Sequence, residues 1–245
     1  MKIIIIGAGP CGLGAAWRLA ELGHDTWTLF EQNHHVGGLS ASFQDSEDFW
    51  WDIGGHVLFS HYPYFDQVMD TVMDREKDWL YHDRSAWVWM ENRFIPYPIQ
   101  NNIHRLPRNI FKECLYGLLD LKNESPARLE HFGDWIQAGF GRGLAKWFLN
   151  PYNYKVWAYP VTELSHNWVG ERMASVDVKR ILDNYIDQKD DIAWGPNARF
   201  RFPKHRGTGA IWGNIAAALP QNKIHLNARL SRIDLNEKTI ELKNG

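Results

Sequence analysis

The sequence predicts an α/β fold in which a β–α–β domain carries an inserted helical bundle and a small antiparallel sheet. Three observations predict it. An apolar run at residues 2–6 is followed by a glycine-rich turn, a helical pattern and a second apolar run. The apolar period becomes helical from about residue 108 to 190, and short alternating segments return near residue 200. The chain has 245 residues, 44% of them hydrophobic, enough to bury a core.

The first thirty residues predict the β–α–β unit. Residues 2–6 are typical of a buried parallel strand. Gly23 fits the C′ position after a helix whose apolar residues recur at helical spacing. These residues are Leu13, Ala16, Trp17 and Ala20. Residues 26–30 are rich in β-branched and aromatic side chains, which predicts a second strand ending at Glu31.

The middle of the chain changes from strands to helices. Residues 47–100 are dense in aromatic residues interrupted by prolines, which predicts short strands. An apolar stripe over residues 110–119 predicts a first helix. Ser125-Pro126 fits an N-cap followed by proline at the first helical position, and so predicts the start of a second. We expect Asn150-Pro151 to break the next helix, and a last helix over residues 178–186.

The C-terminal part returns to alternating strands and one helix. Phe200 and Phe202 alternate like a strand, and residues 207–209 lead into a helix over 211–219. Residues 223–226, 230–235 and 239–242 predict three more strands. The printed sequence stops at Asn244-Gly245, a strong hairpin signal without a return strand. We therefore expect the fold to be incomplete at its C-terminus.

Composition excludes several classes of protein. A net charge of −2 and a pI near 6.6 give no broad basic footprint for nucleic acid. No apolar run approaches the roughly 20 residues of a membrane-spanning helix. Cys11 and Cys114 are too few for a disulfide framework or a cysteine zinc site, and the histidines lack H-E-x-x-H spacing. We expect a cytoplasmic protein without metal, nucleic-acid or membrane partner; a homo-oligomer stays open.

Gly7, Gly9 and Gly12 fit G-x-G-x-x-G between the first strand and the first helix. Glycines at this spacing allow a tight turn and let a pyrophosphate approach the N–H groups of the helix N-terminus. Glu31 lies nineteen residues after Gly12, where a carboxylate can accept hydrogen bonds from a ribose. The unit therefore predicts a dinucleotide site in a Rossmann-like domain.

Two further glycine pairs favour FAD over a nicotinamide dinucleotide. They are Gly37-Gly38 and Gly54-Gly55, and they suggest that backbone approaches a longer cofactor at several points. A disulfide reductase is disfavoured because Cys11 and Cys114 are far apart in sequence. The glycine run at residues 139–143 follows a helical stretch, so we interpret it as a helix terminus and not as a second nucleotide motif.

On these residues the chain resembles the UDP-galactopyranose mutase family, most closely its eukaryotic-type branch. The resemblance rests on six runs in the family's order: residues 7–12, 54–62, 96–102, 151–157, 170–172 and 194–197. The first run is shared with a superfamily of FAD-dependent amine-oxidase-like flavoproteins. The later runs are specific to the mutase.

The resemblance implies FAD, active in its reduced form, with NADPH as electron donor. The implied FAD contacts are Gly7, Gly9, Cys11, Gly12, Glu31, Gly38, Leu39, Gly54, Gly55 and Leu230. His56 would lie on a loop against the flavin. NADPH would lie near His56, Arg84 and Tyr97.

The resemblance also implies a UDP-sugar substrate. Its implied contacts are Tyr97, Gln100, Phe148, Tyr152, Asn153, Trp157, Arg172 and Asn197. Arg172, which would meet the diphosphate, and His56 are the implied catalytic residues. The implied reaction interconverts UDP-galactopyranose and UDP-galactofuranose, with the reduced flavin attacking the anomeric carbon. Ala86 and Ala193 depart from the family, which places a hydroxyl and an amide there.

The resemblance divides the chain into a first FAD-binding part at 1–85, substrate-side β segments at 86–104 and 194–203, a helical substrate domain at 105–193 and a second, truncated FAD-binding part at 204–245. Two alternatives stay open. One is an FAD-dependent amine oxidase or desaturase-like oxidoreductase, which shares the first sixty residues of the pattern. The other is a catalytically incomplete fragment that binds FAD and a UDP-sugar. Binding of a uridine nucleotide would separate the mutase from the oxidoreductase.

Overall fold

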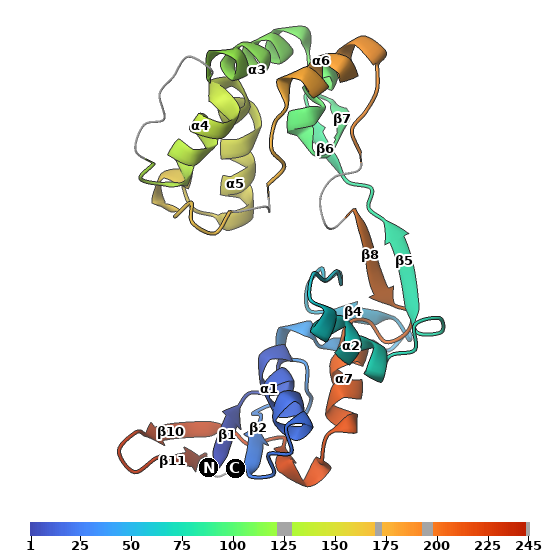
Figure 1. The fold of residues 1–245 in the computed structure, drawn as a ribbon, viewed down its shortest axis with the longest axis vertical. Helices are drawn as coiled ribbons and strands as arrows, with labels where there is room; N and C mark the ends of the chain where they lie inside the picture. Colours follow the sequence, from blue (N-terminus) through green and yellow to red (C-terminus); the bar gives the residue numbers. More distant parts are fainter. Residues whose placement is uncertain (122–128, 170–172, 193–197, 244–245) are drawn as a thin grey trace. The chain divides into compact units, whose positions relative to one another are not determined.

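The computed structural model describes residues 1–121, 129–169, 173–192 and 198–243 (Figure 1). The chain divides into two compact units, one of residues 1–82 and 199–245 and one of residues 83–198. Among the described residues, no helix is long and apolar enough to cross a membrane.

The first unit is built on the predicted β–α–β arrangement. β1 (Ile3–Ile6) runs parallel to β2 (Trp27–Phe30), and the short β9 (Ile224–His225) adds a third parallel strand beside β2. α1 (Pro10–Glu21) connects β1 to β2, and Gly23 beyond its end is left-handed with φ 68°, as predicted. The prediction of a fully buried first strand is wrong at its last residue, which is half exposed, since β1 forms one edge of this three-stranded sheet.

Three helices enclose the apolar core of this unit. α7 (Gly209–Ala218) packs against both α1 and α2 (Pro63–Val72). The buried side chains include Ile5, Leu13, Trp27, Leu29, Met69, Ile211 and Ile215. The prediction of only short strands between residues 47 and 100 is wrong at α2. Pro63 opens this helix at a position where its missing N–H would have no intrahelical partner.

Short two-stranded sheets complete the first unit. β3 and β4 are antiparallel, β5 pairs with β8, and β10 is antiparallel to β11. Their bounds are Ser42–Gln44, Trp50–Asp52, Trp79–Asp83, Arg199–Pro203, Leu230–Asp234 and Thr239–Leu242. The strands predicted after residue 199 are confirmed, and so is the helix that follows residues 207–209.

The second unit opens with an antiparallel hairpin that lies within the predicted β segment 86–104, whereas β8, from the other predicted segment, pairs with β5. β6 (Trp87–Met90) and β7 (Arg93–Pro96) form a hairpin. Glu91 and Asn92 join them, and both are left-handed, with φ of 52° and 57°. Two such residues match the twist of the flanking strands, as in a type I′ turn.

The predicted helical bundle follows the hairpin. Its helices are α3 (Arg108–Asp120), α4 (Phe132–Leu144), α5 (Asn150–Trp157) and α6 (Val178–Asp187). Helices α3, α4 and α6 share one core with residues of the hairpin and of the 3₁₀ turns after it. Its fully buried members include Ile95, Ile99, Ile103, Phe132, Ile136, Leu144 and Ile181.

Two predicted helix boundaries differ from the structure. Ser125-Pro126 lies outside the described residues. The described helix α4 begins at Phe132, after a capping box at His131. Nδ1 of His131 accepts from the Asp134 N–H, and the Asp134 carboxylate accepts from the His131 N–H, at 3.1 and 3.3 Å. The predicted break at Asn150-Pro151 is wrong. A π-helical segment, Ala145–Leu149, leads directly into α5, and proline in the first turn of α5 costs little.

α3 and α4 cross with their backbones in contact at three glycines. A Cβ on Gly143 would lie 2.5 Å from the Cα of Cys114, and one on Gly117 would lie 3.0 Å from the Gly143 nitrogen. A Cβ on Gly141 would overlap the carbonyl of Gly117. Gly141 has non-helical dihedrals, so α4 is kinked within the glycine run that was predicted from the sequence to be a helix terminus. Two helical segments meet at this kink, so the prediction of a helix terminus is confirmed at Gly141, and the run brings α4 onto α3.

We expect Gly143→Ala to lower the free energy of unfolding of the second unit by about 1–3 kcal/mol, the usual cost of overpacking a tight contact. Gly139→Ala is the matched control, because a Cβ there meets nothing within 4 Å. It should be neutral or stabilise the helix by up to about 1 kcal/mol. Urea unfolding followed by circular dichroism measures both. Equal losses in the two variants would contradict the backbone contact.

Candidate functional site

The turn between β1 and α1 presents uncapped backbone N–H groups. Gly7 is left-handed with φ 94°, Gly9 is the N-cap, and Pro10 occupies the first turn. No side chain of the described residues caps this helix end. The free N–H groups and the helix dipole together favour an anion at this position.

Glycines bring three backbone segments together at this helix end. A Cβ on Gly12 would overlap the carbonyl oxygen of Gly7, so only glycine lets α1 approach the turn. A Cβ on Gly38 would lie 3.1 Å from the Cα of Gly9. The structure therefore brings four predicted cofactor residues, Gly7, Gly9, Gly12 and Gly38, into one cluster.

Glu31 is buried at the carboxyl end of β2, beside the same turn. Its Oε2 accepts from the Ala8 N–H at 2.8 Å. Its Oε1 accepts from the backbone and side-chain amides of Asn33 at 2.9 and 2.8 Å. Each carboxylate oxygen can accept two hydrogen bonds, so Oε2 keeps one acceptor position for a ligand hydroxyl.

The other cofactor residues predicted for this region lie around the cluster. Cys11 is exposed in the first turn of α1. Leu39 is 77% exposed in the 3₁₀ turn Gly38–Ser40, which begins at the second residue of the Gly37-Gly38 pair. Leu230 begins β10, and two residues before it the Ala228 N–H donates to the Glu31 carbonyl at 2.8 Å. This bond places the start of β10 near the carboxyl end of β2.

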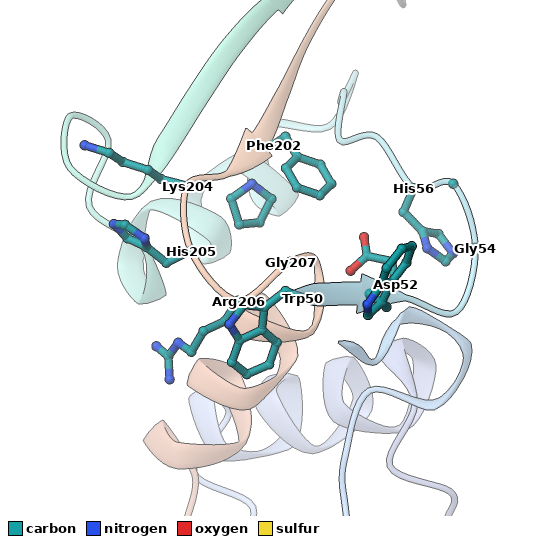
Figure 2. Close-up of a pocket in the computed structure, with 12 residues that line it drawn as sticks. Trp50, Asp52, Gly54, His56, Phe202, Lys204, His205, Arg206 and Gly207 are labelled. Atoms are coloured by element: carbon teal, nitrogen blue, oxygen red, sulfur yellow. The ribbon is translucent and has the colours of Figure 1, made fainter. Parts of the chain in front are cut away.

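A pocket of about 710 Å³ lies elsewhere in the first unit (Figure 2). It gathers the predicted residues Gly54, Gly55 and His56 with Trp50 and residues 202–207. Nδ1 of His56 is buried and has no hydrogen-bond partner among the described residues. A buried ring nitrogen in that condition is suited to meet a ligand.

Asp52 lines this pocket, but its carboxylate caps a helix. Its Oδ1 accepts from the Thr208 N–H at 3.1 Å and from the hydroxyl of Ser42. The Ser42 oxygen in turn accepts from the Gly209 N–H at 2.8 Å. These bonds satisfy the N-terminus of α7, so Asp52 serves structure and is not a free acid in the pocket.

The sequence analysis missed the basic side of this pocket. Lys204, His205 and Arg206 lie along one side of it, while Phe202 and Asp52 point toward its middle (Figure 2). The available signal was three consecutive basic residues before Gly207, which were not singled out from the sequence. The lining therefore combines two basic side chains, Lys204 and Arg206, with the carboxylate of Asp52.

In the second unit, an aromatic cluster gathers several predicted substrate residues. Phe148 and Tyr152 stack with ring centroids 5.0 Å apart. Tyr97 is largely buried, and burial raises the pKa of its hydroxyl; the nearby Tyr152 adds to the rise and Arg84 opposes it. Tyr97 therefore stays protonated near neutral pH and can donate a hydrogen bond. Arg84, Tyr97 and Ala86 also line one small pocket.

Gln100 contributes an unsatisfied acceptor to the second unit. The side chain is 1% exposed, and its Nε2 donates to the Ala174 carbonyl at 3.2 Å. Its Oε1 is buried without a hydrogen-bond partner among the described residues. Such an atom normally pairs with a donor from protein, water or ligand.

The remaining predicted substrate residues are less clearly brought together. Asn153 is buried, and its Nδ2 is used within its own helix, donating to the Leu149 carbonyl at 2.8 Å. Trp157 is half exposed and packs edge-on against Trp168, with centroids 5.4 Å apart. Arg172 and Asn197 lie outside the described residues.

The chain is similar to known flavoproteins in sequence and in structure. A family model described as flavin containing amine oxidoreductase matches residues 10–245. The chain is 48% identical to a solved structure of reduced UDP-galactopyranose mutase, with a TM-score of 0.94, over 100% of this chain and 52% of that one. Cyclohexylamine oxidase from Brevibacterium oxydans shares the fold at 16% identity and a TM-score of 0.63, over 100% of this chain and 55% of that one.

Curated proteins match over shorter stretches. A 15-cis-phytoene desaturase of Synechococcus elongatus is 33% identical over 87 residues, 36% of this chain and 17% of that protein. A 4,4'-diaponeurosporene oxygenase of Staphylococcus haemolyticus is 36% identical over 89 residues, again 36% and 17%. The chain spans about half the length of the solved structures that it matches. The comparisons confirm the predicted resemblance and the Rossmann-like FAD-binding fold.

We expect Gly12→Ala to abolish or strongly weaken flavin binding, because the added methyl group displaces α1 from the glycine turn. Gly14→Ala, two residues further along α1, is the control, because a Cβ at Gly14 meets nothing within 4 Å. The measurement is flavin absorbance per polypeptide in the full-length protein after purification. Retention of flavin by Gly12→Ala at the level of Gly14→Ala would contradict this role of the glycine cluster.

Proposed function

The chain belongs to the flavin-containing amine oxidoreductase family, and we propose that it forms part of a flavin-dependent UDP-galactopyranose mutase. The proposed reaction interconverts UDP-galactopyranose and UDP-galactofuranose. Support comes from the 48% identity to a reduced UDP-galactopyranose mutase over the whole of this chain. The desaturase and oxygenase matches extend over about a third of the chain.

The first unit fits FAD. The uncapped N–H groups of α1 suit a pyrophosphate, and the remaining acceptor position of Glu31 suits a ribose hydroxyl. Open space surrounds the Cβ positions of Gly7 and Gly55, so backbone there is accessible to a ligand. When bound and reduced, FAD would supply the nucleophile for the anomeric carbon of the sugar. His56 would present its unpartnered ring nitrogen to the flavin.

The observation that carries the uridine-nucleotide assignment is the unpartnered Oε1 of Gln100. One of the two Nε2 hydrogens is donated to the Ala174 carbonyl, and the atom of this amide without a partner among the described residues is the acceptor Oε1. Leaving a buried acceptor unpaired costs about 1–3 kcal/mol, so a ligand N–H is favoured there. Uracil presents an N3–H donor, whereas cytosine has an acceptor at the same ring position. The Phe148–Tyr152 stack and Tyr97 supply aromatic surface suited to a base.

NADPH is the proposed electron donor, with His56, Arg84 and Tyr97 as its contacts. Support comes from the resemblance, and from Arg84 and Tyr97 lining the same small pocket. Roles for Arg172 at the substrate diphosphate and for Asn197 near the sugar rest on the resemblance alone. Asn153 and Trp157 are proposed as further walls of the nucleotide pocket on the same basis.

An amine oxidase or desaturase-like oxidoreductase is the second candidate. Its support is the family assignment itself and the partial matches to carotenoid-modifying enzymes. This reading requires neither an orphaned acceptor at Gln100 nor binding of a uridine nucleotide. A uridine nucleotide is therefore the ligand that separates the two candidates.

We expect the full-length protein to convert UDP-galactofuranose to UDP-galactopyranose only after its flavin is reduced. The measurement is chromatographic separation of the two UDP-sugars after incubation with dithionite-reduced or fully oxidised protein under strict anaerobiosis. No net oxidation of the sugar should occur. Equal turnover by the oxidised protein would refute the flavin-nucleophile reaction, and oxidation of an amine without UDP-sugar turnover would favour the second candidate.

We expect the full-length protein to bind UDP more tightly than CDP, and Gln100→Met to weaken UDP binding by about tenfold or more while leaving CDP binding nearly unchanged. Calorimetric titration measures both affinities. Gln137→Met is the control, because Gln137 is exposed on α4. Flavin content should not change in either variant. Equal affinities for UDP and CDP in the unaltered protein would contradict the role of the Gln100 carbonyl.

A further inference from the structure

We propose that Asn102 is a positioning residue of the nucleotide site, whose side-chain amide sets the distance between Tyr97 and the segment that begins at Asp191. The inference rests on the proposed binding of a uridine nucleotide in the second unit. It assigns a role to a residue that need not touch the ligand itself.

The amide of Asn102 is fully buried and lies near the carbonyl groups of Pro96 and Pro98, the two prolines on either side of Tyr97. Its Nδ2 lies 3.3 Å from the Pro96 carbonyl oxygen and 2.9 Å from that of Pro98. A third acceptor, the backbone carbonyl of Asp191, lies 2.8 Å from the same nitrogen. One side chain therefore holds the backbone on both sides of Tyr97 to a residue about ninety positions later.

The acceptor half of the same amide closes the arrangement. The Asp191 N–H donates to Oδ1 of Asn102 at 2.8 Å, so both backbone groups of Asp191 are bonded to one side chain. The buried Asp191 carboxylate accepts from Nδ2 of Asn101 at 2.9 Å and from Arg180 at 2.7 Å. The chain is consequently held at Asp191 by three side chains from two segments.

Two described residues of the later chain, Ile192 and Ala198, lie at the small pocket that Tyr97 lines. Ile192, the residue after Asp191, lines the small pocket together with Tyr97 and Arg84. The Arg84 N–H donates to the Ala198 carbonyl at 2.8 Å, and Ala198 lines the same pocket. Asn102 thus fixes Asp191, and with it Ile192, relative to the backbone around Tyr97, and the backbone bond to Arg84 fixes Ala198.

Only an amide of this length can make these bonds. It must donate to several carbonyls and accept from one N–H at the same time, which a carboxylate cannot do. An apolar replacement would remove the bonds that Asn102 makes to both backbone groups of Asp191 in a buried place. The positions of Tyr97 and Ile192 therefore depend on the side-chain amide of Asn102, although Asn102 does not itself line the small pocket.

The test is Asn102→Asp in the full-length protein. At pH 7.5 the introduced carboxylate faces three carbonyl oxygens, and we expect UDP affinity to fall about tenfold or more while flavin content stays unchanged. At pH 5.5 protonation restores one donor, so part of the UDP affinity should return. The charged and titratable groups around this position are Asp191 with Arg180, and Asp190 with Arg105 and His104. The unaltered protein, titrated at both pH values, controls for them.

Ile136→Ala, which removes buried volume from the same core, is the control for lost stability. Titrated well below its melting temperature, it should bind UDP with unchanged affinity. If Asn102→Asp does not fold, Asn102→Ser, which keeps one hydroxyl donor, is judged by the same comparison. Unchanged UDP affinity in a folded variant at residue 102 would overturn the inference. Absence of UDP binding by the unaltered protein would instead refute the proposed function.

Discussion

Close contact between backbone segments, which only glycine permits, sets the geometry of both units. In the first unit, Gly12 lets α1 lie against the turn at Gly7, and this contact leaves the helix N-terminus open toward a ligand. In the second, Gly143 and Gly117 let α4 lie directly on α3. Because these contacts involve main chain on both sides, neighbouring side chains cannot relax to accept even a methyl group.

Buried polar side chains in the molecule divide into anchors and orphans. Asn102 links distant segments through both halves of its amide, and the partly buried Asp52 caps α7 through its Oδ1. Gln100 and His56 each retain a buried atom without a partner among the described residues. Orphaned atoms cost stability unless a ligand pairs with them, so they mark the surfaces where the cofactor and nucleotide are proposed to bind.

Local sequence patterns predicted elements well where the pattern was also the structural cause. The β–α–β unit and Gly23 after α1 both follow from neighbouring residues. The patterns were wrong at α2 and at Asn150-Pro151, where proline was read as a breaker. In both places proline occupies the first turn of a helix, where the N–H that it lacks is not needed. Proline alone does not reveal which situation applies.

The sequence by itself determined the Rossmann-like fold, the glycine cluster and Glu31, because a short spacing along the chain carries their whole geometry. Tertiary structure alone decided that Asp52 is a helix cap, that residues 204–206 line a pocket and that Asn102 bonds to Asp191. Asn102 and Asp191 are 89 residues apart in the sequence, and Asp52 and Thr208 are 156 residues apart. No local periodicity encodes such pairings, since they depend on how whole elements pack, and so the choice between an anchored and a free polar group required the structure.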